Sequence, residues 1–273
     1  MPIEVRSLAE WQAAGIPGML SVVIPARNEE GHITGTVEGV VGALREAEIS
    51  HEILVINDNS TDRTEHELTK LQAADTNVRY INNMTPNGFG FAVRRGLVEF
   101  RGDAVAIMMA DGSDDPADLV RFYRKLESGY DCVFGSRFVR GSRVIDYPKL
   151  KLVLNRLGNL FIQLLFLLNY NDVTNAFKLY RRRAIAGTQP LLSHHFNLTV
   201  ELPLKCIVRG YRYAVIENSW KNRKEGVSKL RIKEMGSRYL FIILYCWLER
   251  ALSRGDYRDQ EFHWESQLQV WHR

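Results

Sequence analysis

Short apolar runs alternate with amphipathic stretches through the first half of the chain. The runs predict strands at five places: Leu20–Ile24, Glu52–Ile56, Val78–Tyr80, Ala104–Ala110 and Cys132–Phe134. Helices are expected between them: one ending near Ala47, one capped by Ser60 or Thr61 and ending near Ala74, and one from Gly90 to Phe100. This alternation of strand and helix predicts an α/β fold with a mostly parallel, doubly wound sheet.

The pattern changes after Leu150, where two long and strongly apolar helices are expected. They cover Leu152–Leu168 and Leu230–Leu252. Polar residues recur near one face of the first helix, and Lys and Arg flank both ends of the second. Such helices either fill a core or lie on a membrane surface, and the sequence leaves both open.

Charge is divided unevenly along the chain. Residues 1–148 hold 15 Lys and Arg against 22 Asp and Glu, a net charge of −7, whereas residues 149–250 hold 18 against 6, a net charge of +12. The basic part contains both apolar helices, which favours an anionic membrane surface or a lipid phosphate as a partner. The sequence has no helix-turn-helix, zinc-finger or aromatic RNA-binding signature, so nucleic acid is not an expected partner.

Length and composition fit one large α/β core with appendages. The chain has 273 residues, of which 45% are hydrophobic. Its three cysteines lie far apart and have neither metal-site nor disulfide spacing, which indicates a reducing compartment. The longest apolar stretch, Tyr239–Leu248, is too short for a membrane span, and the N-terminal residues have no signal-peptide pattern.

The most informative polar segment is the acid cluster Asp111–Pro116, which directly follows the fourth expected strand. Ligands of open α/β sheets bind at the carboxyl ends of the strands. Three carboxylates there repel one another unless a divalent cation with phosphate oxygens relieves the repulsion. The same residues suit a helix start, with Asp114 or Asp115 as the N-cap and Pro116 at the first helical position. Because a cap needs only one acid, we expect both roles, with Asp111 as the ligand.

Three other loops carry polar residues or glycine, and the first two of them follow expected strands. Pro25–Glu29 offers a carboxylate and backbone amides at a helix start, and Asn57 with Asp58 suits hydrogen bonds to a base or ribose. The segment 87–90 is a glycine turn that enters a helix containing two arginines. It fails as a dinucleotide fingerprint because Val93 occupies the third glycine position. It therefore indicates only a tight loop near an anion.

Together these segments resemble the family-2 glycosyltransferases with the GT-A fold, and within them the polyprenyl-phosphate (dolichol-phosphate) hexose synthases. The resemblance covers about residues 20–232 and rests on six segments in the family's order. They are Val23–Glu29, Val55–Asp62, the acid cluster, Gly135–Gly141, Asp172–Arg181 and Arg223–Leu230. The last three favour the lipid-phosphate branch.

The resemblance implies an assignment of site residues. Nucleotide-sugar binding would involve Pro25, Ala26, Arg27, Glu29, Asn57, Asp58, Gly88 and Asp111. A Mg²⁺ or Mn²⁺ ion on the donor diphosphate would be bound by Asp111 and Asp114, and these two with Arg137 would form the catalytic set. Phosphate oxygens of donor or acceptor would meet Arg137, Arg223, Ser228 and Lys229. Such cations stabilise a diphosphate leaving group.

The chain departs from the family pattern in three motifs. Counted back from Pro116, the family's two metal aspartates are replaced by Ala110 and Gly112, so the acids of this chain are out of register. The second metal ligand therefore stays open between Asp114, Asp115 and water. The other departures are Asn57, which replaces the first aspartate of the nucleotide motif, and Asn175-Ala176, which replace Ser-Gly.

Three further features have no clear place in this site. Glu201, inside an expected helix, is either an acid on the helix face or a site residue. His194 and His195 are adjacent and would point apart on a helix, so a solvent or packing role is expected rather than a metal pair. The segment 260–265 has the composition of a surface extension.

These observations predict a GT-A catalytic domain over residues 1–232, which includes the apolar helix near 152–168, and a membrane-proximal helix and tail over 233–273. The resemblance implies transfer of a hexosyl unit from a UDP- or GDP-sugar to polyprenyl phosphate, with inversion, by a peripheral protein on the cytoplasmic side of the membrane. Two alternatives stay open: a transferase acting on a soluble or glycan acceptor, and a nucleotide-sugar-binding scaffold without turnover. A homo-oligomer or an integral-membrane partner is also compatible with the sequence.

Overall fold

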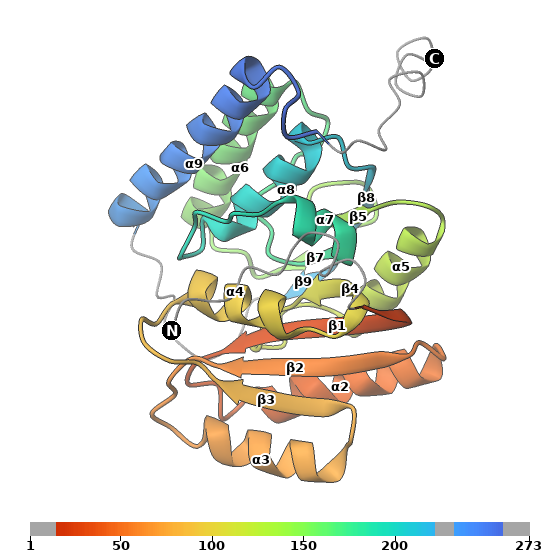
Figure 1. Ribbon diagram of the computed structural model, residues 1–273. Coiled ribbons are helices and arrows are strands. Elements are labelled where there is room, and N and C mark those ends of the chain that lie inside the picture. Colours follow the sequence, from red (N-terminus) through yellow and green to blue (C-terminus); the bar gives the residue numbers. More distant parts are fainter. Residues whose placement is uncertain (1–14, 222–231, 259–273) are drawn as a thin grey trace.

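The computed structural model describes residues 15–221 and 232–258, and a seven-stranded sheet runs through it (Figure 1). The strands are β1 (Ile16–Ala26), β2 (His51–Asn57), β3 (Val78–Asn82), β4 (Gly102–Ile107), β5 (Cys132–Ser136), β7 (Lys178–Arg181) and β8 (Tyr213–Glu217). Their order is β3-β2-β1-β4-β7-β5-β8, and β7 runs antiparallel to β4 and β5 while the other pairs are parallel. A two-stranded sheet pairs β6 (Val144–Ile145) with β9 (Trp220–Lys221). The expected mostly parallel α/β sheet is confirmed.

Helices cover both faces of the large sheet. They are α2 (Ile33–Glu46), α3 (Thr64–Ala74), α4 (Phe89–Glu99), α5 (Pro116–Glu127), α6 (Lys149–Phe166), α7 (Arg182–Gly187), α8 (Leu198–Val208) and α9 (Ile232–Leu252). Alternate strand residues face opposite sides, so Val22 and Ile24 of β1 pack with α2, α3 and α5, whereas Val23 packs with α4 and α8. The result is a sheet between two helical layers.

The fourth strand is shorter than its apolar sequence predicts. Ala104–Ala110 was the expected strand, but β4 ends at Ile107, which lies opposite Lys178 of β7. The Met108 amide still donates to the Val23 carbonyl (3.1 Å), whereas the Met109 amide donates to the Asp114 carboxylate (3.1 Å). The chain thus leaves the sheet before the acid cluster, because the Met109 amide bonds to the Asp114 side chain instead of to a backbone carbonyl of a neighbouring strand.

The start of α3 corrects the expected cap. The helix begins at Thr64, and Asp62 rather than Ser60 or Thr61 accepts its first amide, at 2.9 Å. Ser60 and Thr61 bond instead to the loop after β1: the Ser60 hydroxyl accepts from the Asn28 amide (3.1 Å), and the Thr61 amide donates to the Asn28 side chain (2.8 Å). The two residues therefore join the first and second loops of the site.

Helices α6 and α9 lie side by side on the outer side of α8 (Figure 1). A buried, bidentate ion pair joins α8 to α9, with Arg209 donating to Glu249 at 2.7 and 3.0 Å. Arg250 of α9 also donates to the carbonyl of Phe166, at the end of α6. The expected helix start at Leu230 and the segment 260–265 lie outside the described residues, and the division of the chain at residue 232 stays a prediction.

The Arg209–Glu249 pair yields a prediction on stability. Replacing Glu249 by Ala leaves a buried guanidinium without its carboxylate, which should cost about 3 kcal/mol and lower the melting temperature by roughly 6–12 °C. Thermal unfolding followed by circular dichroism measures this loss. Glu99→Ala removes the exposed pair with Arg95 and should change the melting temperature by less than about 2 °C. Equal effects of the two substitutions would contradict the buried pair's role.

Candidate active site

The loops after β1, β2 and β4 meet at the carboxyl edge of the parallel strands. Asp58 is at the centre of this edge, because its amide donates to the carbonyl of Ala26 (2.8 Å) and its side chain is buried. The carboxylate accepts from the side-chain amide of Asn83 (2.9 Å) and from the Gly88 amide (2.8 Å). Asp58 therefore holds the segment 87–90, called the glycine loop below, next to β1 and β2.

The side chain of Asn57, where the family pattern has aspartate, already has hydrogen-bond partners within the protein. Its amide nitrogen donates to Asn82 (2.7 Å), and its oxygen accepts from the Ser60 amide (3.3 Å). An aspartate here would have no hydrogen to donate to Asn82. The geometry therefore gives Asn57 a role in fixing the loop, while its contact with a nucleotide stays a prediction.

The loop after β1 places its residues at different depths. Pro25 and Ala26 are in the strand, with Ala26 paired to Asn57, whereas Arg27 is exposed. The amide of Glu29 donates to the Thr64 hydroxyl at 2.8 Å, and its carboxylate lies 3.7 Å from His32. The structure thus brings this loop beside Asp58, as expected.

The three neighbouring aspartates of the acid cluster have separate structural roles. Asp111 is half-buried after the turn out of β4, and one of its oxygens accepts from the Ser113 amide (3.2 Å). Gly112 between them has a φ of +66°, which favours glycine. Asp115 is the N-cap of α5, accepting from the Ala117 amide at 2.9 Å, with Pro116 in the first turn. The expected helix cap is therefore Asp115.

Asp114 is the buried member of the acid cluster, with 6% of its surface exposed. Burial raises its pKa to about 7, the Met109 amide opposes that shift, and the charge of Asp111 adds to it. A carboxylate that already accepts a backbone hydrogen bond in a buried position is a poorer metal ligand than the more accessible Asp111. Among the residues that the structure describes, no three His, Cys, Asp or Glu side chains gather as a metal centre.

Arg137 lies at the end of β5 in a buried ion pair with Asp172. Its backbone amide, Nε and one Nη donate to the two carboxylate oxygens at 2.8–2.9 Å. Its guanidinium also lies 5.5 Å from the ring centres of Phe138 and Tyr147. Burial lowers the pKa of Arg137, but the Asp172 carboxylate outweighs burial and keeps it above the usual value. Arg137 therefore stays a fixed cation.

Two cations on α6 approach the same aromatic residues and were not among the expected site residues. Lys151 lies 5.6 Å from the Tyr147 ring centre and 5.7 Å from that of Trp220, and Arg156 lies 4.6 Å from that of Phe138. The sequence feature that could have indicated them is the set of polar residues that recur near one face of this apolar helix. Its Asn155 and Asn159 also bond to Thr174, in the loop that carries Asp172.

Strand β9 holds the acid cluster from the other side. The Lys221 amide donates to the Ser113 carbonyl (3.1 Å), and Asp114 forms an isolated β-bridge with Trp220. Lys221, the last residue described before residues 222–231, therefore lies at the acid cluster. The expected phosphate ligands Arg223, Ser228 and Lys229 lie outside the described residues.

The remaining sequence candidates are packing residues. Gly90 packs against the backbone of His194 and His195, so closely that a Cβ would lie 2.3 Å from the His194 carbonyl carbon. His194 stacks on Phe91 (4.7 Å), in keeping with the expected packing role. Glu201 is fully buried, accepts from two backbone amides at 2.7 Å and pairs with Lys205. It is neither an exposed helix-face acid nor a member of this site.

The buried pair at Arg137 yields a second prediction. Asp172→Asn should lower stability by about 3 kcal/mol, because it leaves the buried guanidinium without its counter-charge. The double variant R137M/D172N should regain part of that loss, because it removes both charges. Urea unfolding of the two variants and the parent measures both values. A double variant less stable than Asp172→Asn would contradict the pairing as the source of the loss.

Comparison with known proteins places the chain in a family. A model described as Glycosyl transferase family 2 matches residues 21–187. The polyprenol monophosphomannose synthase of Mycolicibacterium smegmatis is 27% identical over 220 residues, which are 77% of this chain and 80% of that protein. The undecaprenyl-phosphate mannosyltransferase of Micrococcus luteus is 27% identical over 213 residues, 76% of this chain and 86% of that protein.

A solved structure supports the fold. The glucosyl-3-phosphoglycerate synthase of Mycobacterium tuberculosis, crystallised with Mn²⁺, UDP and glucosyl-3-phosphoglycerate, superposes with a TM-score of 0.64. The sequences are 17% identical, and the match covers 92% of this chain and 86% of that one. The expected GT-A fold is thereby confirmed. Because the family model spans more than half of the sequence, the chain belongs to glycosyl transferase family 2.

Proposed function

We propose that this glycosyltransferase moves a hexosyl unit from a UDP- or GDP-sugar to polyprenyl phosphate, with inversion, on the cytoplasmic side of a membrane. One observation carries the acceptor class. Arg137 is a fixed, buried cation that shares the Tyr147 ring with Lys151 of α6, and α6 and α9 expose a broad apolar surface. A phosphate group attached to a long hydrocarbon matches a cation next to such a surface. The names of the two relatives agree with this acceptor class.

The nucleotide-sugar side is the edge formed by β1, β2 and the glycine loop. The proposed donor residues are Pro25, Ala26, Arg27, Glu29, Asn57, Asp58, Gly88 and Asp111. Asp58 suits an N–H group of the base, because its buried carboxylate has acceptor capacity beyond the two hydrogen bonds that it already receives. Uracil and guanine both offer such a group, so the donor assay decides between them.

The metal proposal is a Mg²⁺ or Mn²⁺ ion held by Asp111 and the donor diphosphate. Mg²⁺ sites commonly use one or two carboxylates with substrate phosphates and water, and Asp111 supplies an accessible carboxylate at the strand end. When bound, the ion would neutralise charge on the leaving diphosphate. Asp114 of the same cluster is the proposed second ligand, and it would bind more weakly than Asp111 because its carboxylate is buried and already accepts from the Met109 amide.

The phosphate side combines Arg137 with Arg223, Ser228 and Lys229. Lys221, two positions before Arg223, is already bonded to the acid cluster, which favours this grouping. A phosphate monoester is largely ionised at pH 7, so the reaction needs positioning and charge neutralisation more than a strong base. No histidine is required for this reaction.

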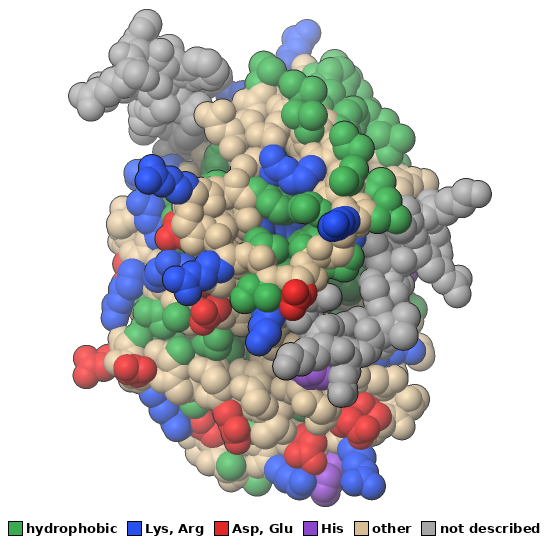
Figure 2. Space-filling model, turned by 180° about the vertical axis from the view of Figure 1, so that it is seen from behind, with side chains coloured by type: hydrophobic (Ala, Val, Ile, Leu, Met, Phe, Trp, Pro, Cys, Tyr) green, Lys and Arg blue, Asp and Glu red, His purple; other side chains and the backbone are tan. Residues whose placement is uncertain are grey.

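The proposed membrane surface is the outer face of α6 and α9. Figure 2 shows apolar side chains gathered in the upper part of the molecule, with several Lys and Arg side chains next to and below them. The exposed residues are Leu150, Val153, Leu154, Leu157, Leu160, Phe161 and Leu164 on α6, and Leu240, Phe241, Leu244, Trp247, Leu248 and Leu252 on α9. In the described part of the chain, neither helix has the length and hydrophobicity of a membrane span. The same apolar face would also fit a second copy of this chain or an integral-membrane partner.

The transfer assay tests the activity and the metal residue together. The purified chain is incubated with radiolabelled UDP- or GDP-hexoses, MnCl₂ or MgCl₂, and polyprenyl phosphate, and label in the lipid fraction is counted. We expect lipid-linked sugar to match released nucleoside diphosphate with one donor. Asp111→Ala should lower turnover by at least 100-fold while leaving the fold intact, because the cluster loses one repelling charge.

Asp115→Ala is the matched control for that substitution. It removes a carboxylate from the same cluster and should cost about 1 kcal/mol of stability through the lost helix cap, with turnover within threefold of the parent. Near-normal activity of Asp111→Ala would refute the metal assignment. Nucleotide binding without sugar transfer to any acceptor would favour the scaffold, and transfer to a soluble or glycan acceptor alone would favour the other alternative.

Vesicle flotation tests the membrane surface. The parent should float with vesicles containing anionic phospholipid, and Leu160→Glu with Phe241→Glu should reduce the floating fraction at least tenfold, because two apolar side chains no longer enter the lipid. Val98→Glu changes an exposed apolar residue of α4, away from this face, and should float like the parent. A parent that remains wholly in the soluble fraction would reject the surface.

A further inference from the structure

Lys178, at the start of β7, is an ammonium in the interior of the molecule. Only 1% of its surface is exposed. Its Nζ donates to three backbone carbonyls, those of Val173 (3.0 Å), Asn175 and Thr199 (3.1 Å). An ammonium has three hydrogens, so this arrangement uses its full donor capacity. A buried lysine with that many carbonyl partners ties separate segments together.

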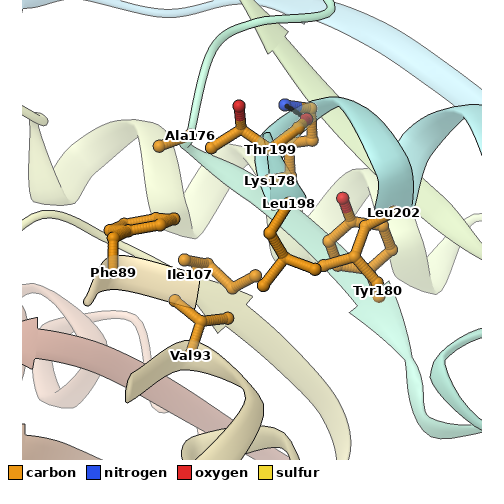
Figure 3. A pocket seen from close by; sticks show the side chains of 9 residues that line it. All are labelled: Phe89, Val93, Ile107, Ala176, Lys178, Tyr180, Leu198, Thr199 and Leu202. Carbon is orange, nitrogen blue, oxygen red and sulfur yellow. Dashed lines mark hydrogen bonds between the residues drawn. The ribbon is translucent and has the colours of Figure 1, made fainter. Parts of the chain in front are cut away.

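The three carbonyls belong to two segments that are far apart in the sequence. Val173 and Asn175 lie in the loop between α6 and β7, whereas Thr199 lies in the first turn of α8. Figure 3 shows Lys178 reaching from β7 to Thr199 above a small cavity with otherwise mostly apolar walls.

One of these segments leads to the phosphate side of the site. Asp172, next to Val173, is the carboxylate that holds Arg137. The amide of Asn175 donates to the Asp172 carbonyl (3.0 Å), and its side chain donates to the Gly135 carbonyl (3.1 Å), near the end of β5. The position of this loop therefore fixes where the guanidinium lies.

The other segment leads to the nucleotide side. The Thr199 hydroxyl donates to the Phe196 carbonyl (2.8 Å), and the Phe196 ring stacks on Phe89 with centroids 4.4 Å apart. Phe89 follows Gly88, whose amide donates to Asp58. The start of α8 thus contacts the loop that Asp58 holds.

We propose that Lys178 is a positioning residue that keeps the Arg137 side and the Gly88 side of the site in a fixed relation. The proposal rests on the proposed function, since it takes these two sides as the binding surfaces for phosphate and nucleotide. Lys178 touches neither group directly. It acts through the loop that carries Asp172 and through the start of α8.

The surroundings of Lys178 also make its charge dependent on pH. Burial lowers its pKa to about 7, the carboxylates of Asp172 and Asp114 oppose that shift, and Arg137 adds to it. The hydroxyl of Tyr180, another titratable group of the cavity wall, has a raised pKa and stays neutral. Below its pKa the ammonium binds all three carbonyls. As the pH rises through that value, one hydrogen is lost and one carbonyl loses its donor.

The experiment compares Lys178→Met, Lys178→Arg and Arg182→Met by hydrogen exchange and mass spectrometry. Met keeps the apolar stem, and Arg keeps the charge at every pH used. Arg182 is the matched control, since it is a buried cation that donates to two carbonyls, Phe100 and Gly102, near the start of β4 and away from the site. Exchange is followed in peptides that contain residues 134–139 and 88–92.

We expect Lys178→Met to exchange at least tenfold faster in both peptides, Lys178→Arg to stay within twofold of the parent, and Arg182→Met to lower the melting temperature without this change. Unchanged exchange in Lys178→Met, or faster exchange in Arg182→Met as well, would overturn the proposal.

Should Lys178→Met fail to fold, the parent is compared with Lys178→Arg between pH 6 and 8.5. Relative to intrinsic exchange, protection in both peptides should fall at least fivefold in the parent alone, and equal profiles would overturn the proposal.

Turnover gives a second readout that separates this proposal from the proposed function. Between pH 6.5 and 8.5, kcat should fall in the parent by a factor at least five times the factor by which it falls in Lys178→Arg. The KM for the donor should change by less than twofold over the same range in both proteins. Parallel kcat profiles in an active enzyme would count against Lys178. A parent without sugar transfer would reject the proposed function, while the exchange measurements would still decide the role of Lys178.

Discussion

The buried ion pair between Arg137 and Asp172 constrains more of this structure than any other interaction. A guanidinium taken out of water must have its hydrogens paired, or the fold loses several kcal/mol. Here the carboxylate accepts three hydrogen bonds from one residue. Strand β5, the loop before β7 and the aromatic rings beside Arg137 must therefore fit together. Helix α6 is bound to the same loop through Asn155 and Asn159.

The strand and helix pattern was largely predictable because it depends on which face of each element is buried. Short apolar runs placed β1 and β2, and the apolar pattern placed α2, α4 and α6 to within a few residues. The errors arose where side chains replaced backbone partners. The first amide of α3 donates to Asp62 rather than to Ser60 or Thr61, and β4 stops at Ile107, after which Asp114 accepts from the Met109 amide. Such choices depend on tertiary neighbours, which a local pattern does not contain.

The candidate site was predictable in its location but not in the roles of its residues. Asp111, Asp114 and Asp115 are chemically alike in the sequence, yet one faces the strand-end edge, one is buried and one caps a helix. The sequence also placed Asp172 and Lys178 in a motif without indicating what they bind. Their partners are Arg137, 35 residues away, and the carbonyl of Thr199, 21 residues away. Only the folded chain brings these groups together.

The exposed leucines of α6 and α9 also determine how the protein behaves in dilute buffer. Soluble monomers rarely show a continuous apolar surface larger than a few hundred Å², because a second copy can cover it and release ordered water. The two helices are joined through Arg250 and the Phe166 carbonyl, so their apolar faces are presented together. Self-association in water should therefore grow with protein concentration. A mild detergent that occupies the same face would compete with it.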